Sequence, residues 1–541
     1  MVQIIQICKR FLFYTILLLI SSLTLKNKNV TANDFGNYLS WSYAKQSRDL
    51  KNLKDFFGSV NLLYVDKRML EEVLFQSVIF DDWEKAKEAS ALIEKIDKGN
   101  VSSTFYYLVD DILKKKNPIS KFNDSHADFL DVNFIKAILL WTTDEGELFN
   151  SISSDNCIPL LCLHMGQRLI MDKKKGEAEK FFTKVEEKNF SSTRIQELLV
   201  LAFLELKKYE KAKKILQKLS IKDLNNNKRK MSFISQNSYL LNPIKTQRDG
   251  VAEVLYNISS WYYQKNLFKY SIFFGKLSLK IRPNFNAARL LIVNAFNEIG
   301  FNQMALDSLS KINERNTYFM SFIKIKSNLY DEIINKKSFL NELKSLSQSY
   351  PNNWEIKLLL ADKFRSLEKY QESIDLYSSV IDNNLIDNKL PVLYSRGIAY
   401  ERLNKWSEAE KDLKEALLIN PNDPYILNYL GYSWLDRNMN LEDALKLLEK
   451  AVELEPNDGY IIDSLGWAFY LTGVFEKSIF YLEKAVSIMP NDATLNDHLG
   501  DAYWKHGRKK EAISQWERVL IIDPNFKNKE KIKNKINVGI K

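Results

Sequence analysis

The sequence has few residues that reverse or interrupt a chain. Only 17 glycines and 11 prolines occur among 541 residues, which is less than half of the roughly 12% share that is usual. Sandwiches and barrels of β-strands need turn residues every 8–12 positions or so, so this scarcity disfavours an all-β fold. Apolar residues make up 45% of the chain, which excludes disordered and collagen-like proteins. We therefore expect a mainly helical protein with a large core.

Cysteine is also scarce. Cys8 lies in the N-terminal segment considered below, which leaves Cys157 and Cys162 for the rest of the chain. Two cysteines provide no disulfide framework, and a separation of five positions is not a metal-ligand spacing. They are either two buried or free thiols or, if the protein is periplasmic, the two halves of one disulfide.

Positive charge is concentrated in three segments, although the formal net charge is +10. Residues 1–32, 222–250 and 527–541 hold the excess of lysine and arginine, and the rest of the chain is slightly acidic. Nucleic-acid binding needs a basic stripe on a folded face. We therefore expect no nucleic-acid partner.

Residues 1–32 have the pattern of an export signal. Lys9 and Arg10 precede an uncharged, mainly apolar run over residues 11–25, and the Val-Thr-Ala of residues 30–32 places small side chains at a cleavage site. The apolar run is shorter than the roughly 20 residues of a spanning helix. We expect a periplasmic or cell-envelope protein, with an uncleaved inner-membrane anchor that faces the periplasm as the alternative.

A repeat of about 34 residues organises the C-terminal part. Two sets of residues recur at spacings of 34 or 35: Gly397, Gly431, Gly466 and Gly500, and Pro421, Pro456, Pro490 and Pro524. Small residues follow the glycines at Ala409, Ala444, Ser478 and Ala512. Apolar residues at i, i+3, i+4 and i+7 predict two amphipathic helices in each period. The glycines and small residues allow these helices to approach closely. Proline stops the second helix, and the Asn-Asp pair after three of the prolines suits the next N-cap.

These positions resemble the tetratricopeptide repeat family. The family pattern W-x2-L-G-x2-Y, followed by A, F, A and P, has its best counterpart at Ile462, Leu465, Gly466, Phe469, Ser478, Leu482, Ala485 and Pro490. Arg396 replaces the usual leucine in one copy, and another copy has one extra residue before Ala444. Short stretches such as residues 430–434 are also similar to repeat proteins that alphaproteobacteria export. The resemblance implies an all-α, right-handed superhelical solenoid of antiparallel helix pairs.

The repeat copies suggest an order of segments along the chain. We predict a signal peptide or anchor at 1–32, degenerate N-terminal repeats at 33–221, a loop insertion at 222–250, middle repeats at 251–389, four well-formed repeats at 390–526 and a basic capping helix or tail at 527–541. A polar cap at the end of the array is what repeat proteins need for solubility.

No catalytic constellation is evident in the sequence. The four histidines, at positions 126, 164, 498 and 506, do not have metal-ligand spacings, and no nucleophile or phosphate-binding motif occurs in its proper context. Asp497 and Asp501 stand four positions apart, which is more typical of a solvated helix face than of an acid–base pair. We expect no enzyme activity, no cofactor and no metal.

The resemblance points instead to a groove. In the family, the first helix of each pair lines a concave face, which here would carry Tyr394, Tyr425, Asn428, Tyr432, Tyr460, Asp463, Trp467, Tyr470, Asp497, Asp501 and Trp504. Aromatic rings contribute apolar contact area, and amide side chains can pair with a peptide backbone. The alternative is that many of these residues only pack neighbouring first helices. Because residues 390–526 carry a net charge of −7, we expect a neutral or basic peptide segment or helix as ligand.

The predicted function is a non-catalytic scaffold of the cell envelope that holds other proteins in this groove. The alternative is a non-catalytic subunit or assembly factor of an envelope enzyme complex, for polysaccharide, lipopolysaccharide or outer-membrane biogenesis. If the N-terminal segment is not cleaved, we expect it to attach the protein to the membrane.

Overall fold

The structure, a computed structural model, describes most of the chain from residue 66 onward. The described ranges are 66–115, 131–143, 151–188, 192–218, 243–309, 318–350 and 353–540, less a few positions within them, with a short segment at 39–43 and isolated residues. The predicted signal at 1–32 and most of the predicted insertion at 222–250 lie outside these residues. The regular structure of the described ranges is helical throughout, without a strand, which confirms the all-α prediction.

Two compact units divide the chain, Met1–Asn335 and Lys336–Lys541. The helices of the first are α4 (Lys67–Ile79), α5 (Trp83–Ile96), α6 (Val101–Leu113), α7 (Val132–Thr142), α9 (Pro159–Met171), α10 (Lys175–Glu187), α11 (Thr193–Glu205), α12 (Tyr209–Lys218), α14 (Gln247–Gln264), α15 (Phe268–Ile281), α16 (Asn286–Glu298), α17 (Asn302–Leu309) and α18 (Phe319–Ile333). The boundary between the units falls inside the predicted middle segment 251–389, whose limits stay predictions.

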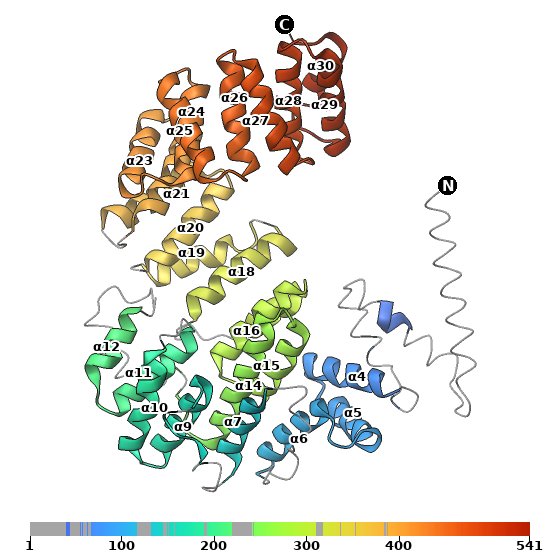
Figure 1. The fold of residues 1–541 in the computed structure, drawn as a ribbon, viewed down its shortest axis with the longest axis vertical. Coiled ribbons are helices and arrows are strands. Elements are labelled where there is room, and N and C mark those ends of the chain that lie inside the picture. Colours follow the sequence, from blue (N-terminus) through green and yellow to red (C-terminus); the bar gives the residue numbers. More distant parts are fainter. Residues whose placement is uncertain are drawn as a thin grey trace. The chain divides into compact units, whose positions relative to one another are not determined.

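The second unit consists of helices of similar length that follow one another through short turns (Figure 1). They are α19 (Leu340–Ser349), α20 (Trp354–Ser366), α21 (Tyr370–Asp382), α22 (Leu390–Arg402), α23 (Trp406–Ile419), α24 (Pro424–Asp436), α25 (Leu441–Leu454), α26 (Gly459–Leu471), α27 (Phe475–Ile488), α28 (Ala493–Lys505), α29 (Lys509–Ile522) and α30 (Lys529–Val538). The closest packing joins α20 to α21, α22 to α23, α24 to α25, α26 to α27 and α28 to α29. The structure is thus a helical solenoid of pairs, with α30 after the last pair.

The repeat glycines lie where the two helices of a pair meet. A β-carbon added to Gly466 on α26 would lie 2.7 Å from Cγ of Leu482 on α27, and one added to Gly500 on α28 would lie 2.5 Å from the ring of Trp516 on α29. Such distances are shorter than side-chain contacts allow, so only glycine fits without a shift. The predicted steric role of these glycines is confirmed.

The Asp of each Asn-Asp pair caps the helix that follows it. Asp423, Asp458 and Asp492 each accept hydrogen bonds from two backbone N–H groups in the first turn of α24, α26 and α28, at 2.8–3.2 Å. These bonds satisfy donors that have no partner within the helix. The predicted N-caps are therefore correct, and they fix where each first helix begins.

The turn inside each pair uses a residue in the left-handed conformation. Asn404, Gly473 and Gly507 hold this place in three of the pairs, at φ of 58°, 78° and 90°. The turn between α24 and α25 has two such residues, Asn438 and Asn440. The extra residue noted before Ala444 is accommodated in this turn, so the helices on both sides keep their register.

The first unit continues the pairing in a less regular form. The weak repeat copies predicted there coincide with pairs such as α9 with α10 and α14 with α15. A β-carbon on Gly166 of α9 would lie 2.8 Å from the ring of Phe182 on α10, as in the C-terminal repeats. Helix α14 already begins at Gln247, inside the predicted insertion, and its Gly250 is buried against the ring of Trp141 on α7.

A buried charge network joins several helices of the first unit. Arg194 on α11 donates two hydrogen bonds to Glu253 on α14, at 2.7 and 2.8 Å, and a third, at 3.1 Å, to Glu197. The hydroxyl of Tyr318, just before α18, donates to Glu197 at 2.6 Å. All four side chains are almost fully buried. Because the buried charges are paired, the network fixes the positions of α11, α14 and α18 relative to one another.

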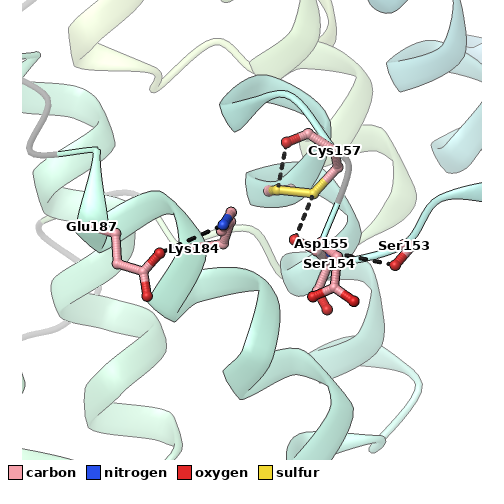
Figure 2. Close-up of a disulfide and its surroundings, with 7 residues drawn as sticks. Ser153, Ser154, Asp155, Cys157, Lys184 and Glu187 are labelled. Carbon is pink, nitrogen blue, oxygen red and sulfur yellow. Dashed lines mark hydrogen bonds and ion pairs between the residues drawn. A yellow bond between two sulfur atoms is a disulfide. The ribbon is translucent and has the colours of Figure 1, made fainter.

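Cys157 and Cys162 form a disulfide at the start of α9 (Figure 2). Their Cα atoms are 5.5 Å apart, within the range that a disulfide requires. Of the two alternatives that the sequence left open, the structure therefore has the disulfide and not the pair of thiols. The bond closes the short loop before α9, near the ion pair of Lys184 and Glu187 on α10.

Among the described residues, no helix is long and apolar enough to cross a membrane. In the same residues, no group of three or more His, Cys, Asp or Glu side chains is arranged to hold a metal ion.

Candidate binding face of the C-terminal repeats

The eleven residues predicted to line the groove all lie on first helices of the pairs. Helix α22 carries one of them, α24 and α28 carry three each, and α26 carries four; they are Tyr394, Tyr425, Asn428, Tyr432, Tyr460, Asp463, Trp467, Tyr470, Asp497, Asp501 and Trp504. We call this set the first-helix face. Its members differ in environment, because some contact the next first helix and others are open to solvent.

The centre of the face is an aromatic stack. The ring of Trp467 lies between Tyr470 of its own helix and His498 of α28, with centroid distances of 4.5 and 4.1 Å and nearly parallel planes. Nδ1 of His498 lies 2.9 Å from Oδ2 of Asp463. His498 therefore joins α28 to the carboxylate and the indole of α26.

The charges around this stack raise the pKa of its members. Burial lowers the pKa of His498, but Asp463, followed by Asp497 and Asp501, outweighs it, so the pKa lies above its ordinary value. Burial and the charges of Asp501 and Asp497 raise the pKa of Tyr470 to about 12. At neutral pH the phenol therefore keeps its proton and can serve as a hydrogen-bond donor.

Asp497 and Asp501 share one lysine from the end of the chain. Nζ of Lys535 on α30 lies 2.7 Å from Oδ1 of Asp497 and 2.7 Å from Oδ1 of Asp501, and Nε1 of Trp516 donates to Asp501 at 2.9 Å. Asp501 is only 7% exposed. The interpretation of the two aspartates as a solvated face is therefore wrong, because the capping helix covers them.

Trp504 is also engaged by the C-terminal segment. Its indole Nε1 donates to the backbone carbonyl of Ile540 at 2.9 Å, and Gly539 lies so close to the ring that a β-carbon there would collide with it. The separations of these contacts, 34 residues for Lys535 with Asp501 and 36 for Ile540 with Trp504, equal about one repeat period. Helix α30 thus takes the place of a further first helix.

A similar contact links the earlier pairs. Tyr394 of α22 meets Tyr429 of α24 edge to face, with ring centroids 5.8 Å apart. Arg437, just after α24, donates to Glu401 of α22 at 2.7 Å. Neither Tyr429 nor this ion pair belongs to the predicted set of eleven residues. A search for complementary side chains one period apart would have found the ion pair, whose partners are 36 positions apart.

The open part of the face lies on α24 and α26. Tyr425 and Tyr460 occupy equivalent positions in successive repeats and are 51% and 55% exposed. Tyr460 donates to Asp492 at 3.1 Å. On the same helix as Tyr425, the side-chain oxygen Oδ1 of Asn428 is buried without a hydrogen-bond partner. A buried acceptor without a donor is unfavourable, so Asn428 gains a hydrogen bond if its side chain turns toward a ligand at this face.

The geometry therefore separates the eleven residues. Seven take part in contacts with neighbouring helices or with the aromatic stack, namely Tyr394, Asp463, Trp467, Tyr470, Asp497, Asp501 and Trp504. Tyr425 and Tyr460 expose their rings, Asn428 has an oxygen without a donor, and Tyr432 is half-buried. Three of the carboxylates that suggested a basic ligand, Asp463, Asp497 and Asp501, are paired within the chain through His498 and Lys535.

Comparison with solved structures gives several helical proteins of low identity. MamA from Desulfovibrio magneticus RS-1 has 21% identity over 32% of this chain and 97% of its own, with a TM-score of 0.29. YrrB, described as a TPR protein with an unusual peptide-binding site, has 16% identity over 36% and 99%, with a TM-score of 0.29. The APC/C hetero-tetramer Cut9–Hcn1 has 14% identity over 88% and 97%, with a TM-score of 0.39. No curated protein matches the chain.

The family comparison gives one direct match. Residues 391–423, which span α22, α23 and the turn to α24, match the tetratricopeptide repeat. The pairs that follow repeat the same glycines, caps and turns at the same period. A repeat of this kind supports a role as a protein–protein interaction scaffold. From the match, residues 391–423 are identified as a tetratricopeptide repeat, and the pairs that follow share its period and its packing.

Proposed function

We propose that the protein is a non-catalytic scaffold of the cell envelope that binds a peptide segment or helix of a partner on the open part of the first-helix face. The observation that carries the proposal is the pair of half-exposed rings of Tyr425 and Tyr460 at equivalent positions of successive repeats, together with the amide oxygen of Asn428, which has no donor. Rings of this kind contribute binding area at low entropic cost, and the amide fixes a peptide backbone by a hydrogen bond.

The paired carboxylates refine the expected ligand. Because Asp463, Asp497 and Asp501 are bonded within the chain, a basic segment would have to displace His498 or Lys535 to reach them. A mainly apolar or neutral segment needs no such exchange. We therefore favour a neutral segment over a basic one.

The envelope location rests on the sequence of residues 1–32 and gains support from the disulfide of Cys157 and Cys162. Disulfides persist in the periplasm and are rare in the cytosol. N-terminal sequencing of the protein from envelope fractions tests this part. A chain that begins at residue 33 supports cleavage, an intact N-terminus supports the anchor, and recovery from the cytosol with free thiols at both cysteines contradicts it.

Site-specific photo-crosslinking tests the binding face in the full chain. A photo-reactive amino acid in place of Tyr425 or Tyr460 should give crosslinked partner bands in living cells. The matched control is the same amino acid in place of Phe480, which is 63% exposed on the second helix α27. The same bands from position 480, or none from 425 and 460, would contradict the proposal. Trp467 and Asp463 are unsuitable here because they hold α28.

A further inference from the structure

The first unit contains a cavity that none of the preceding assignments uses. It has a volume of about 1030 Å³ and opens to solvent on one side, between the end of α4, the start of α5 and the helices α15, α16 and α17. Cavities of this size are typical of sites for small organic ligands. It is separate from the first-helix face, which belongs to the second unit.

The walls of the cavity are mainly aliphatic and aromatic. Its apolar lining includes Ile79, Phe80, Leu113, Leu279, Ile292 and Met304. They come from five different helices or their ends, so the apolar lining surrounds the space on several sides. Such a lining favours a ligand with an extended apolar body.

Three cations stand at the same cavity. Lys276 Nζ lies 2.9 Å from Oδ2 of Asp81, and Lys280 Nζ lies 4.4 Å from the centroid of the Trp83 ring. The third cation is Arg289 on α16. The lining holds only two carboxylates, Asp81 and Asp307. The cavity therefore has an excess of positive charge and attracts an anionic group.

Arg289 provides the specific donor. One of its terminal nitrogens, Nη2, donates to the carbonyl of Pro283 at 2.7 Å, which fixes the guanidinium. Its Nε is buried without a hydrogen-bond partner. The guanidinium itself lines the cavity, and a carboxylate is the acceptor whose planar geometry matches it. Burial also lowers the pKa of Arg289, an effect that an anion beside it would oppose.

The other polar groups of the lining are occupied by one another. Gln303 donates to Asp307 at 3.0 Å, and Ser308 donates to the carbonyl of Met304 at 2.8 Å. A peptide would need partners for its own amides along its length, and these groups do not offer them. A ligand with a single anionic head and no other polar groups fits better.

From these observations we propose that the cavity binds an acyl-chain carboxylate. The carboxylate pairs with the guanidinium of Arg289, which lines the cavity, and the chain lies along the wall of Leu279, Ile292 and Met304. This binding site is independent of the protein-binding role assigned to the second unit, and either could exist without the other.

Calorimetric titration of the full chain with dodecanoate tests the site. One equivalent should bind, and dodecanol, which has the same chain without the charge, should bind at least about tenfold more weakly. The substitution Arg289→Met should weaken dodecanoate binding by about tenfold or more, the loss expected for one charge-assisted hydrogen bond. The matched control is Arg518→Met in the second unit, whose side chain likewise donates to a proline carbonyl, at 3.0 Å from Pro490; it should bind as the wild type does.

Four outcomes would overturn the assignment: no binding of dodecanoate, equal binding of dodecanol, unchanged binding by Arg289→Met, or tighter binding of the tripeptide acetyl-Leu-Phe-Leu than of dodecanoate. Circular dichroism establishes that each variant is folded. If Arg289→Met does not fold, Met304→Trp replaces it, because the larger ring fills the apolar part of the cavity. That variant should lose dodecanoate binding, and unchanged affinity in it would also overturn the proposal.

Discussion

At the scale of single residues, Arg396 stands where the family pattern has leucine, and its side chain forms an ion pair. Its guanidinium donates to both carboxylate oxygens of Asp412 on α23, each at 2.7 Å, and Asp412 is only 2% exposed. In the next repeat the two equivalent positions hold Leu430 and Leu447. The pair therefore replaces an apolar contact of the other repeats by a buried ion pair within one helix pair.

We predict that Arg396→Leu alone is strongly destabilising and that Asp412→Leu restores stability in the double variant. The single change leaves a buried carboxylate without its cation, at a cost of about 3 kcal/mol or more, whereas an apolar pair of similar volume is close to neutral. Urea unfolding of the single and double variants measures this. A double variant as unstable as the single one would contradict it.

The pairing of His498 with Asp463 predicts a pH dependence. Because the folded-state pKa of His498 is raised, the pair contributes fully below about pH 6.5, the unfolded value, and its contribution is lost as the pH rises through the folded value. Protonated His498 should therefore stabilise the second unit in mildly acidic solution, by on the order of 1 kcal/mol.

Proton NMR of the His498 ring measures this pKa directly. Asp463→Asn should lower it, and the matched change Asp436→Asn, at an exposed carboxylate on α24, should leave it unchanged. Titration of His498 at or below its ordinary value in the wild type would show that the carboxylate does not hold the imidazolium.

At the scale of helices, the sequence predicts most of what the structure contains. Spacing alone places the repeat glycines between paired helices and the aspartates of residues 423, 458 and 492 at the N-caps. These features are local or lie within one period, so a pattern in one chain reveals them. The degenerate copies before residue 390 are harder to recognise from the sequence. Their close packing uses residues outside the repeat pattern, such as Gly250 against the ring of Trp141.

The contacts of the first-helix face could be predicted only in part. That aromatic and acidic residues gather on first helices follows from the period. Which of them pair with the next helix does not, because it depends on side chains such as His498 and Lys535 that the family pattern leaves unspecified. The partners do lie about one period after the aspartates. His498 follows Asp463 by 35 positions, and Lys535 follows Asp497 and Asp501 by 38 and 34.

The packing between repeats predicts the effect of Ala485→Leu on α27. Ala485 is fully buried and contacts the layer formed by Ile462 and Leu495 from two neighbouring first helices. The added methyl groups have no space, so we expect a loss of about 1–3 kcal/mol through overpacking. Thermal unfolding measures it, with Ser487→Leu at an exposed position of the same helix as control. Equal melting temperatures for the two variants would mean that the assigned register is wrong.

At the scale of the whole molecule, each of the two units has buried clusters of its own. Among the described residues, one cluster of buried apolar side chains runs from Trp41 to Leu329, and four others lie between Ala361 and Ile532. Helices α20 and α21 contribute to the second group, since Ala361 and Tyr377 pack in one cluster with Leu393. The predicted start of the regular repeats at residue 390 would cut through this cluster.

We therefore predict that a fragment of residues 336–541 folds on its own and that a fragment of residues 390–541 is less stable. The shorter fragment exposes the apolar side chains of α22 that α20 and α21 cover. Circular dichroism and thermal unfolding of both fragments measure this. If the shorter fragment melts at the same temperature or higher, α20 and α21 add nothing to the stability of the repeats.

The position of α30 has a consequence for assembly. A stack of repeats is open-ended, and a bare last pair would offer another copy a surface shaped to receive a helix. Helix α30 fills that position with Ile532 fully buried and turns Lys531 and Lys533 outward. Helix α30 therefore covers the surface of the last pair on which a further helix would pack.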